Sequence, residues 1–470
     1  PFKTFKEQVE ILNGGNRGKL RIKTDDETIY CLMRYNYYSI INFYKEPFLK
    51  GKDLNGNDIY KSGDHFNHLK ALYDFDKSLR IDFNLLSDAQ NTEVIFGQLR
   101  KEPYWGGSHS HLIAPNLGNF RLQVFDGTQL VFSKGFNSLA NEWATLEEAK
   151  AEKRLFAHAM QLPFPTKKLL LHLDKRDKQG VFHTIATKEL SPDDYFIIEE
   201  TQPSYPIKQL LNNGNAAKKV DIVILAEGYT VTETEKFYAD AQRMTDYMFT
   251  IPPFDKLKKD FNVYAIAVPS KESGTDVPGK HIYKNTAFNA SFYTFNQERY
   301  LTTNSMQAIA DAASAVPYDQ IYVLVNTSTY GGGAFYNHLN LASADNELSE
   351  KVYIHEFGHG FVGLADEYYY DWDPTFQETY DPKIEPWEEN ITTLVNFESK
   401  WKDMVKKGTP IPTPRISKYK NTLGAFEGGG YTSKGVYSPM QDCRMKSNDP
   451  KGFCPVCERA IRKTVDFYTK

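Results

Sequence analysis

Hydrophobic and polar positions alternate in short stretches through the first 200 residues of the chain. The stretches LRIKTDDETIYCLMRY, FRLQVFDGTQLVFSKGF, KKLLLHLDKRDKQGVFHTIATK and YFIIEE carry Val, Ile, Phe and Tyr in partial alternation, and Asp-Gly, Lys-Gly and Gln-Gly pairs punctuate them. Short strands divided by such turns predict an antiparallel β-sandwich. One segment between them, ATLEEAKAEKRLFAHAM at 144–160, is predicted to be a helix.

The pattern changes after a stretch with two prolines and an Asn-Asn-Gly-Asn cluster, which predicts a linker at 201–216. Beyond it, DIVILAEGY, FNVYAIAVP and DQIYVLVNTS are apolar runs suited to strands covered on both faces. The helical patterns TETEKFYADAQRMTDYMF and SMQAIADAASAV alternate with these strands. The prediction is therefore an α+β protein, with an accessory β-sandwich at 1–200 and an α/β domain at 217–470.

Composition narrows the choice of partners. The chain has 470 residues, 41% of them hydrophobic and 25% charged, with a formal net charge of −4 and no long basic run. Nucleic acid is therefore not expected as a partner. No window approaches the roughly 18 consecutive apolar residues of a membrane span. Because the chain begins at Pro1, we expect that an upstream segment, such as a secretion signal, has been removed.

Two histidines stand four residues apart in YIHEFGHGFVGLADEYYY, at 353–370. On a helix His355 and His359 share one face about 6 Å apart, so both rings can bind one ion. Zn²⁺ accepts imidazole ligands, and catalytic zinc sites leave one of four positions to water. Glu356 borders that face, where it can accept a proton from the water. The pattern predicts a zinc site with Glu356 as general base.

The alternative is a buried helix that merely contains two histidines, and the neighbouring residues argue against it. Three glycines lie in or just after the helix, where each costs about 1 kcal/mol in a purely structural helix. Gly363 can adopt the left-handed turn that ends a helix and returns the chain toward the metal. Asp366 follows as a third ligand, and Ser349 with Glu350 predicts the helix start.

Three consecutive glycines follow the strand DQIYVLV, in the segment Tyr330, Gly331, Gly332 and Gly333. Glycines in a strand mark backbone that another chain approaches closely. An exposed strand beside the metal helix can pair with the backbone of a peptide substrate. A flexible loop is the alternative.

With these residues in view, the chain closely resembles the immunoglobulin-A peptidase family of zinc metallopeptidases, which are metzincin-like. The matching segments are VDIVILAEGYT, PSKESGTDVP, YGGGAFYN, HEFGHGFVGLADEY and YSPMQDCRM. GNFRLQVFDG, FNSLANEW and LPFP resemble the accessory domain of that family. The resemblance covers nearly the whole chain. It implies a secreted or cell-surface bacterial endopeptidase that acts on a protein or peptide, such as immunoglobulin or another host or dietary glycoprotein.

The resemblance also implies roles for single residues. His355, His359 and Asp366 are the expected zinc ligands and Glu356 the base, with Glu367 the alternative third ligand. Compared with the common metzincin spacing, Gly363 and Asp366 both stand one residue later, so the interval between them is unchanged. Met445 matches the methionine turn, and Met440 is its rival. Tyr437 is expected to polarise the scissile carbonyl.

The cysteines predict an oxidised, extracytoplasmic protein. Cys443, Cys454 and Cys457 cluster near the end of the chain, and Cys31 stands alone. Three thiols without a nearby histidine do not complete a zinc site, so we expect a disulfide from Cys443 to Cys454 or Cys457. Two other functions remain open: a carbohydrate- or protein-binding surface protein with a vestigial zinc site, and a hydrolase of other amides or esters.

Overall fold

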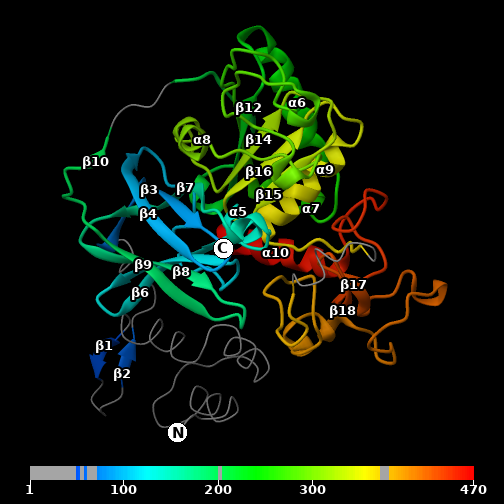
Figure 1. Ribbon diagram of the computed structural model, residues 1–470. Coiled ribbons are helices and arrows are strands. Elements are labelled where there is room, and N and C mark those ends of the chain that lie inside the picture. Colours follow the sequence, from blue (N-terminus) through cyan, green and yellow to red (C-terminus); the bar gives the residue numbers. More distant parts are fainter. Residues whose placement is uncertain (1–48, 53–57, 61–70, 200–203, 371–379) are drawn as a thin grey trace.

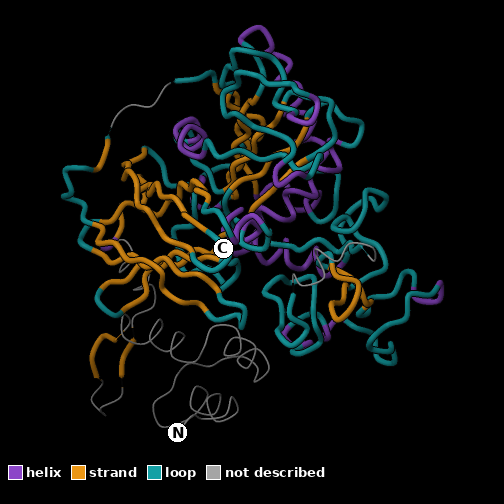
Figure 2. The backbone as a smooth tube through the Cα atoms, viewed as in Figure 1, coloured by secondary structure: helices purple, strands orange, loops and turns teal. Residues whose placement is uncertain are grey.

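The computed structural model describes residues 49–52, 58–60, 71–199, 204–370 and 380–470. Two bodies of regular structure lie beside each other, one built almost wholly of strands and the other of strands and helices (Figures 1 and 2). A small hairpin precedes them, in which β1 (Leu49–Lys52) pairs with β2 (Asp58–Tyr60). The predicted strand LRIKTDDETIYCLMRY, together with Cys31, lies outside the described residues.

The first body is the predicted sandwich, built from two four-stranded sheets in the orders β10-β4-β3-β7 and β6-β5-β8-β9. All pairings are antiparallel except the short pairing of β10 with β4. The strands are β3 (Tyr73–Ser87), β4 (Thr92–Glu102), β5 (Phe120–Asp126), β6 (Gln129–Phe136), β7 (Arg154–Pro165), β8 (Leu169–Arg176), β9 (Phe182–Leu190) and β10 (Ile197–Ile198). One core fills the space between the sheets, because buried side chains of β3, β5 and β8 meet there.

The helix predicted at 144–160 is wrong. Helix α5 (Leu139–Trp143) ends before it, a 3₁₀ turn covers Glu148–Lys150, and most of the remainder is strand β7. The Ala, Glu, Lys and Arg content favours a helix locally. Yet from Phe156 onward buried positions first alternate and then become continuous, and pairing with β3 along its length overrides the propensity.

The second body is a six-stranded mixed sheet in the order β11-β13-β12-β14-β16-β15. The inner pairings are parallel, whereas the edge strands β11 and β15 run antiparallel to their neighbours. The strands are β11 (Ile207–Leu211), β12 (Val220–Glu227), β13 (Phe261–Ile266), β14 (Gln320–Val325), β15 (Gly332–Phe335) and β16 (Leu339–Ser343). All eight residues of β12 are buried, as predicted for a strand covered on both faces.

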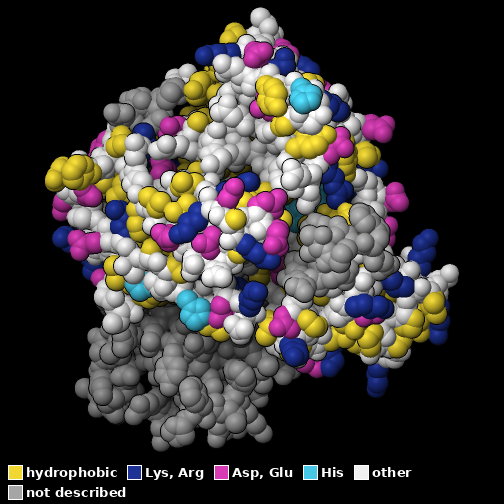
Figure 3. All heavy atoms as spheres, in the orientation of Figure 1, with side chains coloured by type: hydrophobic (Ala, Val, Ile, Leu, Met, Phe, Trp, Pro, Cys, Tyr) yellow, Lys and Arg dark blue, Asp and Glu magenta, His cyan; other side chains and the backbone are white. Residues whose placement is uncertain are grey.

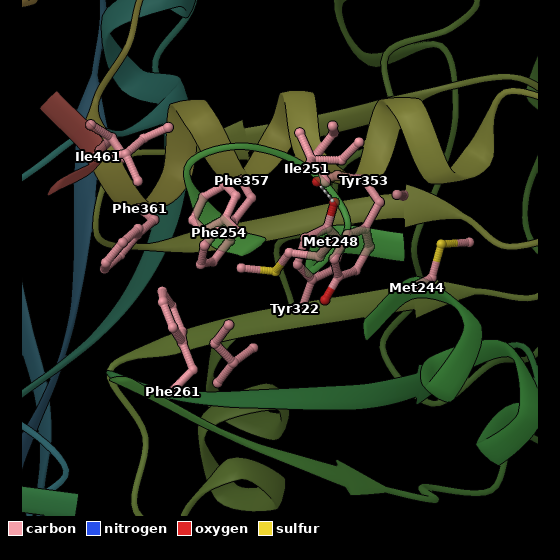
Figure 4. Close-up of a cluster of buried hydrophobic side chains, with 14 of the residues drawn as sticks. Met244, Met248, Ile251, Phe254, Phe261, Tyr322, Tyr353, Phe357, Phe361 and Ile461 are labelled. Atoms are coloured by element: carbon pink, nitrogen blue, oxygen red, sulfur yellow. Dashed lines mark hydrogen bonds between the residues drawn. The ribbon is translucent and has the colours of Figure 1, made fainter. Parts of the chain in front are cut away.

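Helices cover both faces of this sheet. One face packs against α6 (Thr234–Met248), α7 (Phe254–Leu257), α9 (Ser349–Phe357) and α10 (Pro455–Thr469), and the other against α8 (Met306–Ala313). Figure 4 shows the first of these cores, in which Tyr353, Phe357 and Phe361 point from α9 and the turn after it toward the sheet. The Tyr353 ring stacks on Tyr322 of β14 at 3.9 Å between centroids. This packing fixes the rotation of α9 on the sheet. A further hairpin, β17 (Phe426–Gly429) with β18 (Thr432–Ser438), lies apart from the sheet.

The segment 201–216 is more than a linker. Its residues Ile207–Leu211 form β11, which pairs with β13 at the edge of the second sheet. Three of the five β11 residues are exposed, which is why the stretch lacks an apolar signal. The second domain therefore begins before residue 217 in the structure.

The two bodies are joined by polar contacts. Arg80 of β3 is buried, bonds Asp82 and Glu102 within the sandwich, and reaches Asp311 of α8 at 2.7 Å. Glu142 of α5 accepts a hydrogen bond of 2.7 Å from the hydroxyl of Tyr300. The sandwich thus contacts the second domain through both α8 and the segment that runs beside β15.

The face of the molecule shown in Figure 3 does not favour one sign of charge. On the face shown in Figure 3, Lys and Arg side chains are interspersed with Asp and Glu side chains. Among the described residues, no helix combines the length and the apolarity required to cross a membrane.

Candidate metal centre

Helix α9 presents two histidines toward a carboxylate. The Nε2 atoms of His355 and His359 lie 3.0 Å apart, and they lie 3.1 and 3.2 Å from Oδ1 of Asp366. The side chains of both histidines remain 17% exposed, whereas that of Asp366 is 5% exposed. The predicted ligands therefore converge on one point that is reachable from solvent.

Backbone carbonyls orient both imidazole rings. Nδ1 of His355 donates to the carbonyl oxygen of Arg444 at 2.9 Å, and Nδ1 of His359 donates to that of Leu364 at 2.6 Å. Because a carbonyl only accepts, each Nδ1 carries a proton, and each Nε2 is directed at the shared point, where its lone pair can bind a cation. Metal-binding histidines are held in this way.

A π-helical turn brings the chain back so that Asp366 faces the two histidines. The α-helix ends at Phe357 and continues as a π turn over Gly358–Val362, which ends at Gly363 with φ 73°. Gly363 thus makes the predicted left-handed turn. A π turn has i→i+5 geometry and so holds one residue more than an α turn. This extra residue accounts for the one-residue shift of Gly363 and Asp366 noted in the sequence.

The donors fit a metal ion. Oδ1 of Asp366 is buried without a hydrogen-bond partner among protein atoms, although it faces both histidines. Burial alone would raise the pKa of Asp366, but the charges of His359 and His355 hold that pKa well below its usual range. Burial opposes protonation of His359, yet the Asp366 carboxylate raises the pKa of His359 to about 9. The cluster therefore favours a positive charge at the point where the three donors meet.

Glu367, the alternative ligand, points elsewhere. Its side chain is fully buried, accepts from Nδ2 of Asn390 at 2.9 Å, and lies 3.3 Å from the sulfur of Cys457. Asp366 alone of the two joins the histidines in the structure.

The general-base candidate, Glu356, is half-buried beside the first histidine. Burial raises the pKa of its carboxyl group, and the nearby His355 and His359 partly offset this. Strand β15 passes so close that a Cβ on Gly332 would lie 2.7 Å from Oε1 of Glu356. Glycine at position 332 thus leaves the space that the Glu356 side chain occupies.

Gly332 and Gly333 of the triple-glycine segment lie in the edge strand β15, and the segments that approach these glycines closely belong to this chain. The carbonyl of Gly332 accepts from the amide of Leu301 at 3.1 Å, and that of Gly331 accepts from Ser343 at 3.2 Å. A Cβ on Gly333 would lie 2.5 Å from the carbonyl oxygen of Leu301. Substrate binding by Tyr330 and these glycines stays a prediction, and substrate pairing at Gly332 competes with Leu301.

Met445 lies beneath the helix. It is fully buried, and a Cβ on Gly358 would lie 2.7 Å from its sulfur. Met440 is only half-buried. The glycine between the two histidines thus makes room for Met445, and the role of Met445 as the methionine turn stays a prediction.

The structure does not join Tyr437 to this cluster. Its backbone bonds to Thr392, and the charges that act on its hydroxyl are Glu427 and Lys434. The catalytic role of Tyr437 stays a prediction. Instead, the hydroxyl of Tyr431 donates to Oδ2 of Asp366.

Sequence reasoning missed Tyr431, which stands at the turn between β17 and β18 with φ 64°. This turn holds Asp366, the predicted third ligand, since the Gly430 amide donates to the Asp366 carbonyl at 2.8 Å. The three glycines before Tyr431 indicate a turn, but no local pattern indicates which segment that turn contacts.

A helix that carries two histidines and a glutamate, with an aspartate carboxylate against both histidines, is an arrangement typical of metallopeptidases. A family model described as IgA Peptidase M64 matches residues 208–422 and 415–465, more than half of the chain. A second model, described as Peptidase M64 N-terminus, matches residues 70–187. The chain belongs to the IgA peptidase M64 family. A search of curated proteins found no match to it.

Proposed function

We propose that this peptidase is a zinc-dependent endopeptidase that cleaves extracellular protein substrates. The observation that carries the proposal is the meeting of His355, His359 and Asp366 at one solvent-accessible point beside Glu356. Two imidazole nitrogens, one carboxylate and an open position form a donor set that suits catalytic Zn²⁺. When bound there, zinc lowers the pKa of a water molecule and polarises the scissile carbonyl.

The chain supplies the proton transfers. Glu356 acts first as a general base, which accepts a proton from the attacking water. It then acts as a general acid, which passes that proton to the leaving amine. Its partly buried position favours both roles, because burial brings the pKa of a carboxyl group upward toward neutral pH. The carbonyls of Arg444 and Leu364 and the hydroxyl of Tyr431 keep the three donors in place throughout.

Substrate and location complete the proposal. We assign a protein or peptide substrate, and immunoglobulin and other host or dietary glycoproteins are the first candidates to test. We also assign a secreted or cell-surface location. The location now rests on the family and on the substrate class, since the structure contains free cysteines at 443, 454 and 457 rather than the expected disulfide.

The test uses the full chain and unfolded casein. Activity should disappear with 1,10-phenanthroline and return when Zn²⁺ is added in excess. Internal cleavage products, identified by mass spectrometry, would establish endopeptidase action. Full activity in the chelator, with zinc absent by elemental analysis, would refute zinc dependence. An inactive protein with zinc bound would favour the binding-protein alternative.

A further inference from the structure

A second group of metal-binding side chains lies next to the first. Glu367, Cys443, Cys454 and Cys457 bring one oxygen and three sulfurs within 4.8 Å of one another. All four residues are buried, with exposed fractions between 0% and 4%. None of these residues has a part in the mechanism described above.

The spacing of the sulfurs suits a shared ion. Sγ of Cys457 lies 3.8 Å from that of Cys443 and 3.6 Å from that of Cys454. A disulfide needs about 2.05 Å between sulfurs. Tetrahedral thiolates at about 2.3 Å from a zinc ion stand about 3.8 Å apart. The observed separations match the second geometry and exceed the first.

Three segments supply the donors. Cys454 is the N-cap of α10 and Cys457 lies in its first turn, which positions both at the helix end that stabilises thiolates. Cys443 precedes Met445, and its sulfur accepts from the Cys454 amide at 3.2 Å. Glu367 follows Asp366 directly, so the fourth donor comes from a residue 76 positions before Cys443.

Glu367 is the second, independent indication of a cation. Its Oε2 is buried with no hydrogen-bond partner. Within the described part of the chain, none of the ion pairs involves Glu367, and Lys446 bonds its backbone carbonyl instead. The charges of Lys446 and Arg415 act on this carboxyl group without forming an ion pair with it. A buried carboxylate left unpaired is costly, and so is a cluster of buried thiolates. A divalent cation between the four donors satisfies all of them.

We propose that Glu367, Cys443, Cys454 and Cys457 bind one Zn²⁺ in a closed, structural site. Four protein ligands and complete burial leave no position for water, and thiolate ligands in tetrahedral geometry select zinc among the common ions. The ion ties the segment of the third catalytic ligand to the methionine turn and to α10. The amide of Glu367 already donates to the Met445 carbonyl at 2.7 Å in the same junction.

Metal counting tests the proposal on the full chain. The protein purified without chelator should contain two zinc ions, and the double variant His355→Ala, His359→Ala should retain one. X-ray absorption at the zinc edge of that variant should show sulfur neighbours at about 2.3 Å. Cys457→Ser should lower the zinc content of the parent by one, whereas the control Cys31→Ser should leave it at two.

The parent protein alone can overturn the proposal, even if the cysteine variants fail to fold. Zinc neighbours that are all nitrogen or oxygen in the fully loaded parent would refute the second site. A mass for the unreduced, denatured protein that reveals a Cys443 disulfide would also refute it. Either result leaves zinc-dependent peptidase activity untouched, because that activity depends on the histidine cluster.

Discussion

Asp366 and Glu367 are neighbours in the sequence, yet their side chains enter two different clusters. Asp366 meets two histidines that remain partly exposed, and Glu367 meets three cysteines that are buried. The donors of the first cluster are intermediate in hardness, and those of the second are mostly soft sulfur. The contrast teaches that solvent access, rather than the presence of metal-binding residues, separates a site for chemistry from a site for stability.

The largest expected effect is a loss of peptidase activity when the general base beside the histidine cluster is replaced. Glu356→Gln keeps the shape of the side chain but removes its ability to accept a proton, so kcat should fall about 10²–10⁴-fold. Zinc content should not change. Peptide hydrolysis and elemental analysis measure the two quantities, with Glu350→Gln on the same helix as the control. Parent-level activity in the Glu356 variant would exclude it as the base.

The next comparison separates the two neighbouring carboxylates. Loss of a residue that only orients a metal ligand typically weakens metal binding about 10–100-fold. Asp366→Ala removes a ligand itself, so it should weaken zinc binding at the histidines by more than that. Glu367→Gln should leave that affinity within a few-fold. Competition with a coloured chelator measures both. The opposite ranking would make Glu367 the third catalytic ligand.

A smaller effect is expected from the tyrosine that holds Asp366. Tyr431→Phe removes the hydroxyl that bonds Oδ2 of Asp366, so zinc affinity should fall about 10–100-fold. Tyr437→Phe should leave zinc affinity unchanged and is the matched control. If Tyr437→Phe instead lowers kcat while Tyr431→Phe has no effect on either quantity, the sequence-based role for Tyr437 is correct.

The smallest effect concerns Met445, whose side chain packs against Gly358 beneath the histidine cluster. Met445→Leu conserves volume and should lower the free energy of unfolding by less than about 1.5 kcal/mol. Urea unfolding of the zinc-loaded protein gives the value, with the half-buried Met440→Leu as the control. A loss above about 3 kcal/mol, typical of a cavity, would show that leucine cannot fill the space against Gly358.

The sequence predicted the parts of the site that depend on local spacing. The start of the helix at Ser349, the left-handed Gly363 and the carboxylate at Asp366 follow from helix periodicity and from glycine stereochemistry. The apolar runs that became β12, β13 and β14 were equally visible, because strands buried on both faces have no polar positions.

The failures involve contacts between distant segments. The stretch at 144–160 has helical composition, but β7 is set by its pairing with β3. Glu367 lies too far in sequence from Cys443 to be counted as a ligand beside the cysteines. Tyr431 reaches Asp366 only because the turn of the β17–β18 hairpin bonds to the backbone of Asp366. In each case the decisive partner is a residue that no local pattern identifies.

The contact between Arg80 and Asp311 has a consequence for the order of events during synthesis. These residues are separated by 231 positions, which a ribosome needs about 12–46 s to translate at about 5–20 residues per second. Arg80 already has Asp82 and Glu102 within the sandwich, so that domain can fold while the peptidase domain is still unmade. We therefore expect the sandwich to fold first, wherever the chain folds, and the peptidase domain to assemble against it afterwards.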